Sequence, residues 1–213
     1  MQSYVIHLIR HGAVDETLRG KYIGRTDVGL SEKGKQSLRK LYESGVYPHP
    51  RAVFSSPLLR CTETCSILFP EQKPECLPAF SECDFGEWEN RSAAELAGDP
   101  KFAEWLQNSE KTPPPGGESG KVFANRITKG FERLVGRLMQ EGITESVLVT
   151  HGGVIMTLLA VYGLPQAPAY QWRMDNGYGF SLRINSFLWM RDKVCEVFDT
   201  CPPAPKAPEP DPE

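Results

Sequence analysis

Three short segments combine histidine, arginine and glycine in a pattern that suits phosphate chemistry. They are Arg10-His11-Gly12, the stretch 55–60 that ends in Arg60, and the stretch 150–153 with His151, Gly152 and Gly153. Guanidinium and imidazole N–H groups can surround a tetrahedral dianion, and glycine lets backbone N–H groups approach it closely. Each segment alone is weak evidence, because a histidine after a strand is usually structural. The three together favour a site for a phosphorylated ligand.

Such a set of side chains can transfer a phosphoryl group without a metal. A nucleophilic histidine must be neutral, so one of its ring nitrogens needs an acceptor for its proton. Positive groups must face the phosphoryl oxygens as charge develops, and two arginines can supply that charge. An alcohol leaving group also needs a proton, which a carboxyl near phosphate can give because the like charge raises its pKa. We therefore expect no metal and no cofactor.

Hydrophobic runs and turn residues predict the elements that position these segments. Strands are predicted at 4–9, 52–54, 146–150, 180–184 and about 187–198, the last two as a possible hairpin. Helices are predicted from Ser31 to Gly45, after Pro57 to about Leu68, from Ser119 onward, and over 154–161. This alternation predicts a three-layer α/β/α sandwich with a mixed, mostly parallel sheet, for which we expect six strands, one more than these five segments. His11 and His151 then follow strand ends, where ligands bind in such folds.

Length and composition limit the organisation of the chain. The 213 residues suit one domain over residues 1–201, with an irregular insertion at about 76–118 as a partial lid. Trp88 and Trp105 of this insertion either line a substrate mouth or pack against other aromatic side chains. A proline-rich tail over 202–213 is expected to be disordered.

Charge and hydropathy exclude several classes of protein. A net charge of −3 does not favour nucleic-acid binding, and no apolar run is long enough for a membrane span. No signal peptide is recognisable, so we expect a cytoplasmic protein. The six cysteines are then expected to be free thiols.

The segments also resemble the histidine phosphatase superfamily, in its phosphoglycerate-mutase-like branch. The similarity covers nearly everything before the proline-rich tail. Its matching stretches are 8–12, 24–27, 30–34, 54–64, 82–89, 116–119 and 149–153.

The resemblance implies roles for the matching residues. His11 would attack phosphorus and form a phosphohistidine, and Glu82 would protonate the leaving oxygen. The phosphoryl oxygens would be held by Arg10, Arg60, His151 and the backbone N–H of Gly152. Thr17 stands where the family often has asparagine, and it can still donate one hydrogen bond to phosphate. Geometry alone cannot separate Glu82 from its acidic neighbours Asp84, Glu87 and Glu89.

The leading function is hydrolysis of a small phosphomonoester. Within the family, the chain resembles the α-ribazole phosphatases of cobalamin synthesis, which suggests α-ribazole 5'-phosphate. The alternatives are a phosphoglycerate mutase and a non-catalytic regulatory module that binds a phosphorylated ligand. Acidic residues outnumber cations in the stretch 82–119, which favours a substrate with one phosphate and a neutral remainder over a mutase. The sequence leaves the oligomeric state open, a homodimer included.

Overall fold

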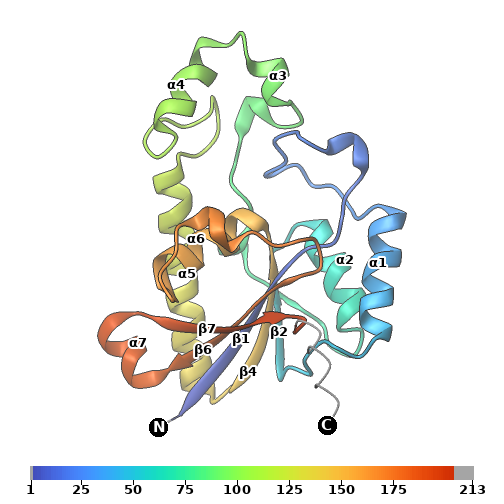
Figure 1. The fold of residues 1–213 in the computed structure, drawn as a ribbon, viewed down its shortest axis with the longest axis vertical. Helices are drawn as coiled ribbons and strands as arrows, with labels where there is room; N and C mark the ends of the chain where they lie inside the picture. The colour runs from blue at the N-terminus through green and yellow to red at the C-terminus, as the bar shows by residue number, and fades with distance from the viewer. Residues whose placement is uncertain (1, 204–213) are drawn as a thin grey trace, which may run out of the picture.

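A seven-stranded sheet runs through the computed structural model, which describes residues 2–203 (Figure 1). In the order in which they lie side by side, its strands are β3 (Glu75–Cys76), β2 (Ala52–Ser55), β4 (Glu145–Thr150), β1 (Ser3–Arg10), β6 (Gly179–Asn185), β7 (Cys195–Cys201) and β5 (Gly163–Leu164). Only β6 is antiparallel to its neighbours, β1 and β7. The sheet is therefore mixed and mostly parallel, as predicted.

The strand number and the closing hairpin differ from the prediction. The sheet has seven strands rather than six, because β3 and β5 at its two edges are only two residues long and leave no hydrophobic period in the sequence. The strand predicted from about residue 187 was wrong at its start. Ser186–Asp192 forms helix α7, which begins there because the Asn185 side chain accepts hydrogen bonds from the N–H groups of Phe187 and Leu188.

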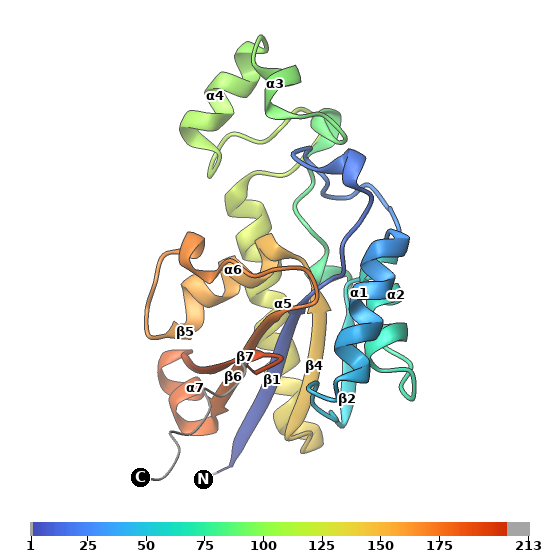
Figure 2. The ribbon, with the colours of Figure 1, turned by 45° about the vertical axis from the view of Figure 1, so that its right-hand side comes forward.

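Two pairs of helices cover the two faces of the sheet, which confirms the three-layer sandwich (Figures 1 and 2). Helices α1 (Glu32–Glu43) and α2 (Leu59–Leu68) lie on one face. Helices α5 (Gly120–Glu141) and α6 (Gly152–Tyr162) lie on the other. The middle strand β4 shows the alternation that this requires: Val147 and Val149 pack with α1 and α2, and Leu148 packs with α5 and α6.

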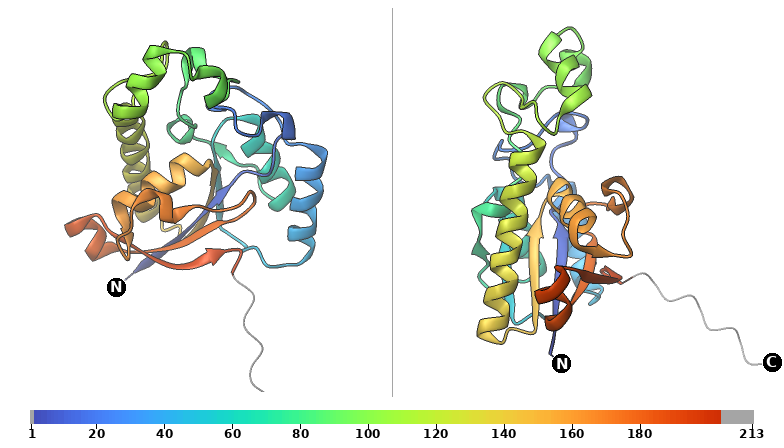
Figure 3. Two further views of the ribbon diagram at one scale, coloured as in Figure 1. Left: turned by 45° about the horizontal axis from the view of Figure 1, so that its top comes forward. Right: turned by 90° about the vertical axis from the view of Figure 1, so that its left-hand side faces the viewer.

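The insertion stands above the sheet and has a small core of its own (Figure 3). It contains helices η3 (Gly86–Trp88), α3 (Ala93–Leu96) and α4 (Pro100–Asn108). Its core consists of Trp88, Leu96 and Phe102, with Tyr22 and Trp105 packed against it. Trp88 is 1% exposed, so the packing alternative holds for that side chain.

Short 3-10 helices are η1 (Glu16–Leu18), η2 (Pro78–Phe80) and η4 (Ala169–Trp172). No helix between residues 2 and 203 has both the length and the apolar character needed to cross a membrane. All six cysteines are unbridged, as predicted. Most of the predicted tail, residues 204–213, lies outside the described part of the chain.

Candidate active site

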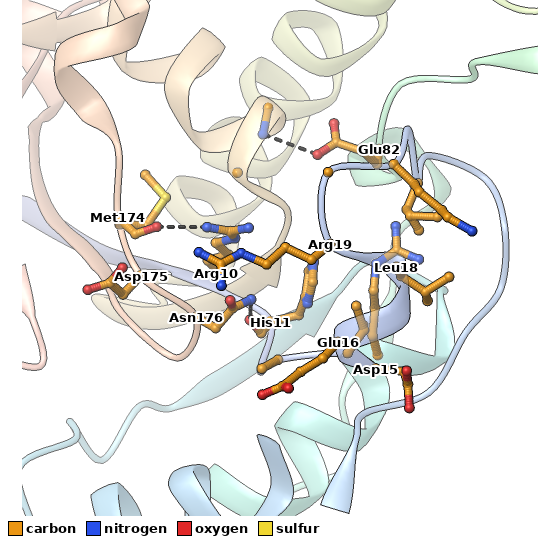
Figure 4. Close-up of a pocket in the computed structure, with 18 of the residues that line it drawn as sticks. Arg10, His11, Asp15, Glu16, Leu18, Arg19, Glu82, Met174, Asp175 and Asn176 are labelled. Carbon is orange, nitrogen blue, oxygen red and sulfur yellow. Dashed lines mark hydrogen bonds between the residues drawn. The ribbon is translucent and has the colours of Figure 1, made fainter. Parts of the chain in front are cut away.

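A pocket of about 870 Å³ lies beyond the carboxyl ends of β1 and β4 (Figure 4). This volume accommodates a small metabolite as well as its phosphate. Five of the predicted site residues line it, and they are Arg10, His11, Arg60, Glu82 and Gly152. They come from the end of β1, the start of α2, the insertion and the start of α6, so the fold brings together four separate segments.

His11 follows the last residue of β1, and its ring is held in one orientation. Its Nδ1 lies 2.7 Å from the carbonyl oxygen of Gly12. A carbonyl can only accept, so Nδ1 carries the proton and Nε2 keeps a free lone pair. Burial, with the positive charge of Arg60 as the second cause, lowers the pKa of His11 to about 3. The ring is therefore neutral at physiological pH and has the tautomer that a nucleophile needs.

His151 is fully buried and, unlike His11, does not line the pocket. The two rings meet edge to face, with their centroids 5.2 Å apart. The Nε2 atom of His151 lies 2.8 Å from the Ser56 hydroxyl and 3.6 Å from the Cys61 sulfur. Burial lowers the pKa of His151 well below its ordinary value, so this ring is also neutral. Its role as a phosphoryl ligand stays a prediction, which its place against His11 favours.

Two arginines supply the positive charge of the pocket. Arg60 donates from Nη1 to the carbonyl of Thr26, at 2.9 Å, and from Nη2 to the carbonyl of Gly24, at 2.7 Å. Arg10 donates from Nη1 to the carbonyl of Met174, at 2.9 Å. Its Nε is buried and has no partner within residues 2–203. A buried donor without a partner is costly, so a bound anion would satisfy it.

The start of helix α6 forms one wall of the pocket. Gly152 and Gly153 are its first two residues, and a helix N-terminus favours an anion because its dipole is positive there. The N–H of Gly153 already donates to the carboxyl group of Glu82. A Cβ atom on Gly153 would lie 2.5 Å from the Glu82 carboxyl oxygen. Glycine at this position therefore lets the carboxyl pack directly against the helix.

Glu82 lies at this wall with both carboxyl oxygens engaged. Oε2 accepts from the Gly153 N–H at 3.1 Å, and Oε1 accepts from the Cys83 N–H at 3.0 Å. Burial raises the pKa of Glu82, although these two hydrogen bonds and the nearby arginines act in the opposite direction. The carboxyl therefore keeps its proton to a higher pH than an ordinary glutamate, which is the property of a general acid.

The acidic neighbours of Glu82 do not line the pocket. Glu87 is exposed, and Asp84 accepts from the N–H of Gly86 at 2.9 Å. Burial acts to raise the pKa of Glu89, but its hydrogen bonds outweigh this and the pKa is lowered. The backbone N–H groups that donate to Glu89 belong to Gly24, Arg25, Thr26 and Phe85. This arrangement supports Glu82 as the proton donor.

Thr17 is the one predicted phosphate ligand that the structure leaves away from the other site residues. It is exposed, and its N–H and hydroxyl both donate to Asp15, at 2.9 and 2.6 Å. The cause is local, since Asp15 caps helix η1 and takes up the hydroxyl proton that a phosphate would need.

Sequence reasoning missed the outer wall of the pocket, which two loops form. The loop before residue 24 contributes Arg19 and Lys21, and the loop after η4 contributes Arg173 and Asn176. Asn176 donates to the His11 carbonyl at 2.8 Å. Loops carry no hydrophobic period, so their approach to each other leaves no signal in the sequence. The one available signal was the density of charge between residues 12 and 30.

Gly24 offers a test of how tightly the site is built. A Cβ atom there would lie 1.7 Å from the Cys83 carbonyl oxygen. Because that oxygen belongs to the backbone, it cannot move aside as a flexible side chain could. We expect Gly24→Ala to destabilise the protein by about 1–3 kcal/mol. Activity should also fall, because the Gly24 carbonyl holds Arg60. Urea unfolding and a phosphatase assay measure the two effects.

Gly136 in helix α5 is the matched control. A Cβ atom there meets nothing within 4 Å. Because alanine favours the helix, Gly136→Ala should raise stability by about 0.5–1 kcal/mol and leave activity unchanged. If the two variants had equal stability and equal activity, the backbone around Gly24 would have room for a side chain and the prediction would be wrong.

Fold and site together define an α/β protein whose pocket holds a neutral, oriented histidine together with two arginines. The model of the histidine phosphatase superfamily (branch 1) matches residues 6–189. The chain belongs to that superfamily, as the resemblance of its motifs implied.

Two of the relatives are named for different reactions. The chain is 27% identical over 199 residues to the adenosylcobalamin/alpha-ribazole phosphatase of Salmonella typhimurium, covering 91% of this chain and 92% of that protein. It is 32% identical over 162 residues to the 2,3-bisphosphoglycerate-dependent phosphoglycerate mutase 2 of Gloeobacter violaceus, covering 71% and 72%.

Two solved structures with the same two kinds of name also match this fold. The alpha-ribazole phosphatase from Shigella flexneri superposes with a TM-score of 0.72 at 23% identity, over 91% of this chain and 94% of that one. The phosphoglycerate mutase from Thermus thermophilus gives 0.62 at 27% identity, over 85% and 93%. The fold is thus the same in relatives named for different reactions.

Proposed function

We propose that this protein hydrolyses a small phosphomonoester through a phosphohistidine on His11. The observation that carries the proposal is the neutral His11 ring, whose Nδ1 is fixed by the Gly12 carbonyl and whose Nε2 is free to attack. Arg10, Arg60 and the start of α6 surround the place where a phosphoryl group would lie. The six unbridged cysteines suit a reducing compartment, and we place the enzyme in the cytoplasm.

The reaction has two halves. The Nε2 lone pair of His11 forms a bond to phosphorus while the ester P–O bond breaks. The alcohol oxygen takes the proton of Glu82. Water then attacks the phosphohistidine and gives a proton back to Glu82. The P–N bond breaks, and inorganic phosphate and the starting enzyme are restored. In both halves Arg10 and Arg60 would balance the charge on the phosphoryl oxygens.

The named substrate is α-ribazole 5'-phosphate, and its support comes from the relatives. The Salmonella protein is named an adenosylcobalamin/alpha-ribazole phosphatase, and the match covers 91% of this chain. Hydrolysis of α-ribazole 5'-phosphate, compared with a panel of other phosphorylated metabolites, tests this assignment. A hundredfold preference for another member of the panel would replace it.

The outer wall gives phosphoglycerate mutase activity a specific supporting observation. Of the acidic stretch 82–119, which argued against a mutase, only Glu82 lines the pocket. The wall instead carries the cations Arg19, Lys21 and Arg173, and Figure 4 shows Arg19 extending toward the side of the pocket that holds Arg10. The same lining also holds the acids Asp15, Glu16 and Asp175, of which Glu16 is paired with Lys33 at 2.8 Å, so the charge of the cations is partly offset. Such cations can hold a second anionic group on a substrate.

A direct comparison separates the two reactions. The enzyme is given 3-phosphoglycerate with catalytic 2,3-bisphosphoglycerate, and isomerisation is measured beside phosphate release. We expect release to be faster, because the pocket is open to water. Isomerisation about tenfold faster than release, or 1.4 kcal/mol of barrier, would make the protein a mutase. Absence of both, and of activity on nitrophenyl phosphate, would indicate a module that only binds phosphorylated ligands.

Activity should survive chelators and be inhibited by vanadate. No group of three or more metal-binding side chains occurs among residues 2–203, and the two arginines supply positive charge without one. Vanadate adopts the five-coordinate geometry of in-line transfer, so it should bind more tightly than phosphate. Phosphatase assays with EDTA and with vanadate measure both effects. Loss of activity in EDTA that added metal restores would contradict this prediction.

A further inference from the structure

Arg126 of helix α5 holds the backbone that carries Glu82 from outside the pocket. Its Nη1 donates to the carbonyls of Ala79 and Ser81, both at 2.9 Å, and its Nη2 donates to the carbonyl of Glu82 itself, at 3.3 Å. This stretch leaves helix η2 and enters no strand, so these carbonyls lack regular partners. The guanidinium therefore fixes the peptide units on which the Glu82 carboxyl depends.

Arg126 is in turn held by Glu118. The two side chains form an ion pair with two hydrogen bonds and are 22% and 12% exposed. Glu118 also accepts from the backbone N–H of Asp84, at 3.0 Å. The pair therefore binds the chain on both sides of Glu82. Charge-assisted bonds in a partly buried place hold geometry better than exposed pairs do.

Arg60 has a separate anchor in Glu89. The carbonyls of Gly24 and Thr26 accept from Arg60, and the N–H groups of the same two residues donate to Glu89. Glu89 thus fixes the short stretch of backbone that aims the guanidinium. Within residues 2–203, the anchors at Arg126 and at Glu89 share no hydrogen bond, but Arg25 links them, since its N–H donates to Glu89 and its side chain forms an ion pair with Glu118 at 3.9 Å. That ion pair is long and its arginine is 37% exposed, so it couples the two anchors only weakly.

We propose that Arg126 is a positioning residue for the general acid and Glu89 a positioning residue for the phosphate-binding arginine. Protonation of the leaving group and binding of the phosphoryl group are then set by two separate anchors and can be uncoupled by mutation. This inference rests on the proposed role of Glu82.

The test compares conservative variants on two substrates. Glycerol phosphate has an alcohol leaving group that needs a proton, whereas nitrophenyl phosphate has one that leaves as the anion. The variants are Arg126→Lys, Glu89→Gln and Glu82→Gln, each measured for both rates, for vanadate inhibition and for thermal stability. Arg137→Lys is the matched control, because Arg137 lies on the same helix and bonds Glu75 and Glu141 away from the pocket.

Arg126→Lys should lower the rate on glycerol phosphate by about ten- to a hundredfold, the effect of a catalytic group displaced by about 1 Å. The rate on nitrophenyl phosphate should change less than about threefold and vanadate inhibition not at all, because neither depends on the acid. Glu89→Gln should lower both rates equally and weaken inhibition by vanadate, since it disturbs phosphate binding. Arg137→Lys should resemble the unchanged enzyme in every rate.

Each other outcome has a distinct meaning. Equal losses of Arg126→Lys on both substrates, or weaker vanadate binding, would make its role merely structural and overturn the inference. If Arg126→Lys does not fold, Glu118→Gln weakens the same anchor from its other side and must show the same substrate dependence. If Glu82→Gln itself shows no dependence on the leaving group, the proposed acid is wrong and the inference fails with it. If Glu82→Gln shows it and Arg126→Lys does not, only the inference fails.

Discussion

Replacing His11 with alanine should leave less than about a thousandth of the phosphatase activity, because the covalent route is lost. The fold should survive, since His11 contributes one side-chain hydrogen bond, to its neighbour Gly12. Initial rates and thermal unfolding measure the two properties. His49→Ala is the control, because His49 is exposed and does not line the pocket.

Labelled phosphate identifies the nucleophile directly. Rapid quenching of the native enzyme with a labelled substrate should trap the label on His11. The pKa of about 3 adds a pH dependence, because His11 stays neutral where an ordinary histidine becomes protonated. The rate should therefore show no acid limb near pH 6.5 from His11. Label recovered on His151 instead would reverse the assignment of the two rings.

Glu82→Gln should lower the rate on alkyl phosphates by about 10²–10⁴-fold and the rate on nitrophenyl phosphate far less. The amide occupies the same space but has no proton to give. In the native enzyme, the rate on alkyl phosphates should fall as the pH rises through the raised pKa of Glu82, where the carboxyl loses its proton. The variant should lose this dependence.

Glu87→Gln is the matched control for Glu82→Gln. Glu87 lies five residues further along, is exposed and does not line the pocket, so its amide variant should be fully active. Equal losses of Glu82→Gln on both substrates would transfer the search to Glu89, whose lowered pKa makes it a poorer proton donor.

The layers of the fold could be predicted because each depends on a pattern local to its own segment. Ser31 and Ser119 cap α1 and α5 as their positions before apolar helical repeats indicated. Strand β4 contains the apolar run 147–149, which marks it in the sequence. Edge strands β3 and β5 could not be predicted, because two residues define no period. Helix α7 was missed because its capping residue, Asn185, follows an apolar strand without a turn.

The site was predictable where a side chain follows directly from a strand end, as for His11 and His151. It was not predictable where distant loops meet. Asn176 reaches the His11 carbonyl across 165 residues of sequence, and no local pattern records that contact. For Thr17, the position in a motif does not reveal that its hydroxyl donates to Asp15.

Substitutions at different residues of the site would cost different amounts of stability. Arg60, His151 and Glu82 are buried or multiply bonded, so most substitutions there would cost stability as well as chemistry. Arg19 and Arg173 are exposed on loops, where replacement costs little stability. A lineage can therefore alter the outer wall by single, nearly neutral steps while the chemistry is kept. Drift of this kind would let a single scaffold acquire new substrates repeatedly without passing through an unfolded ancestor.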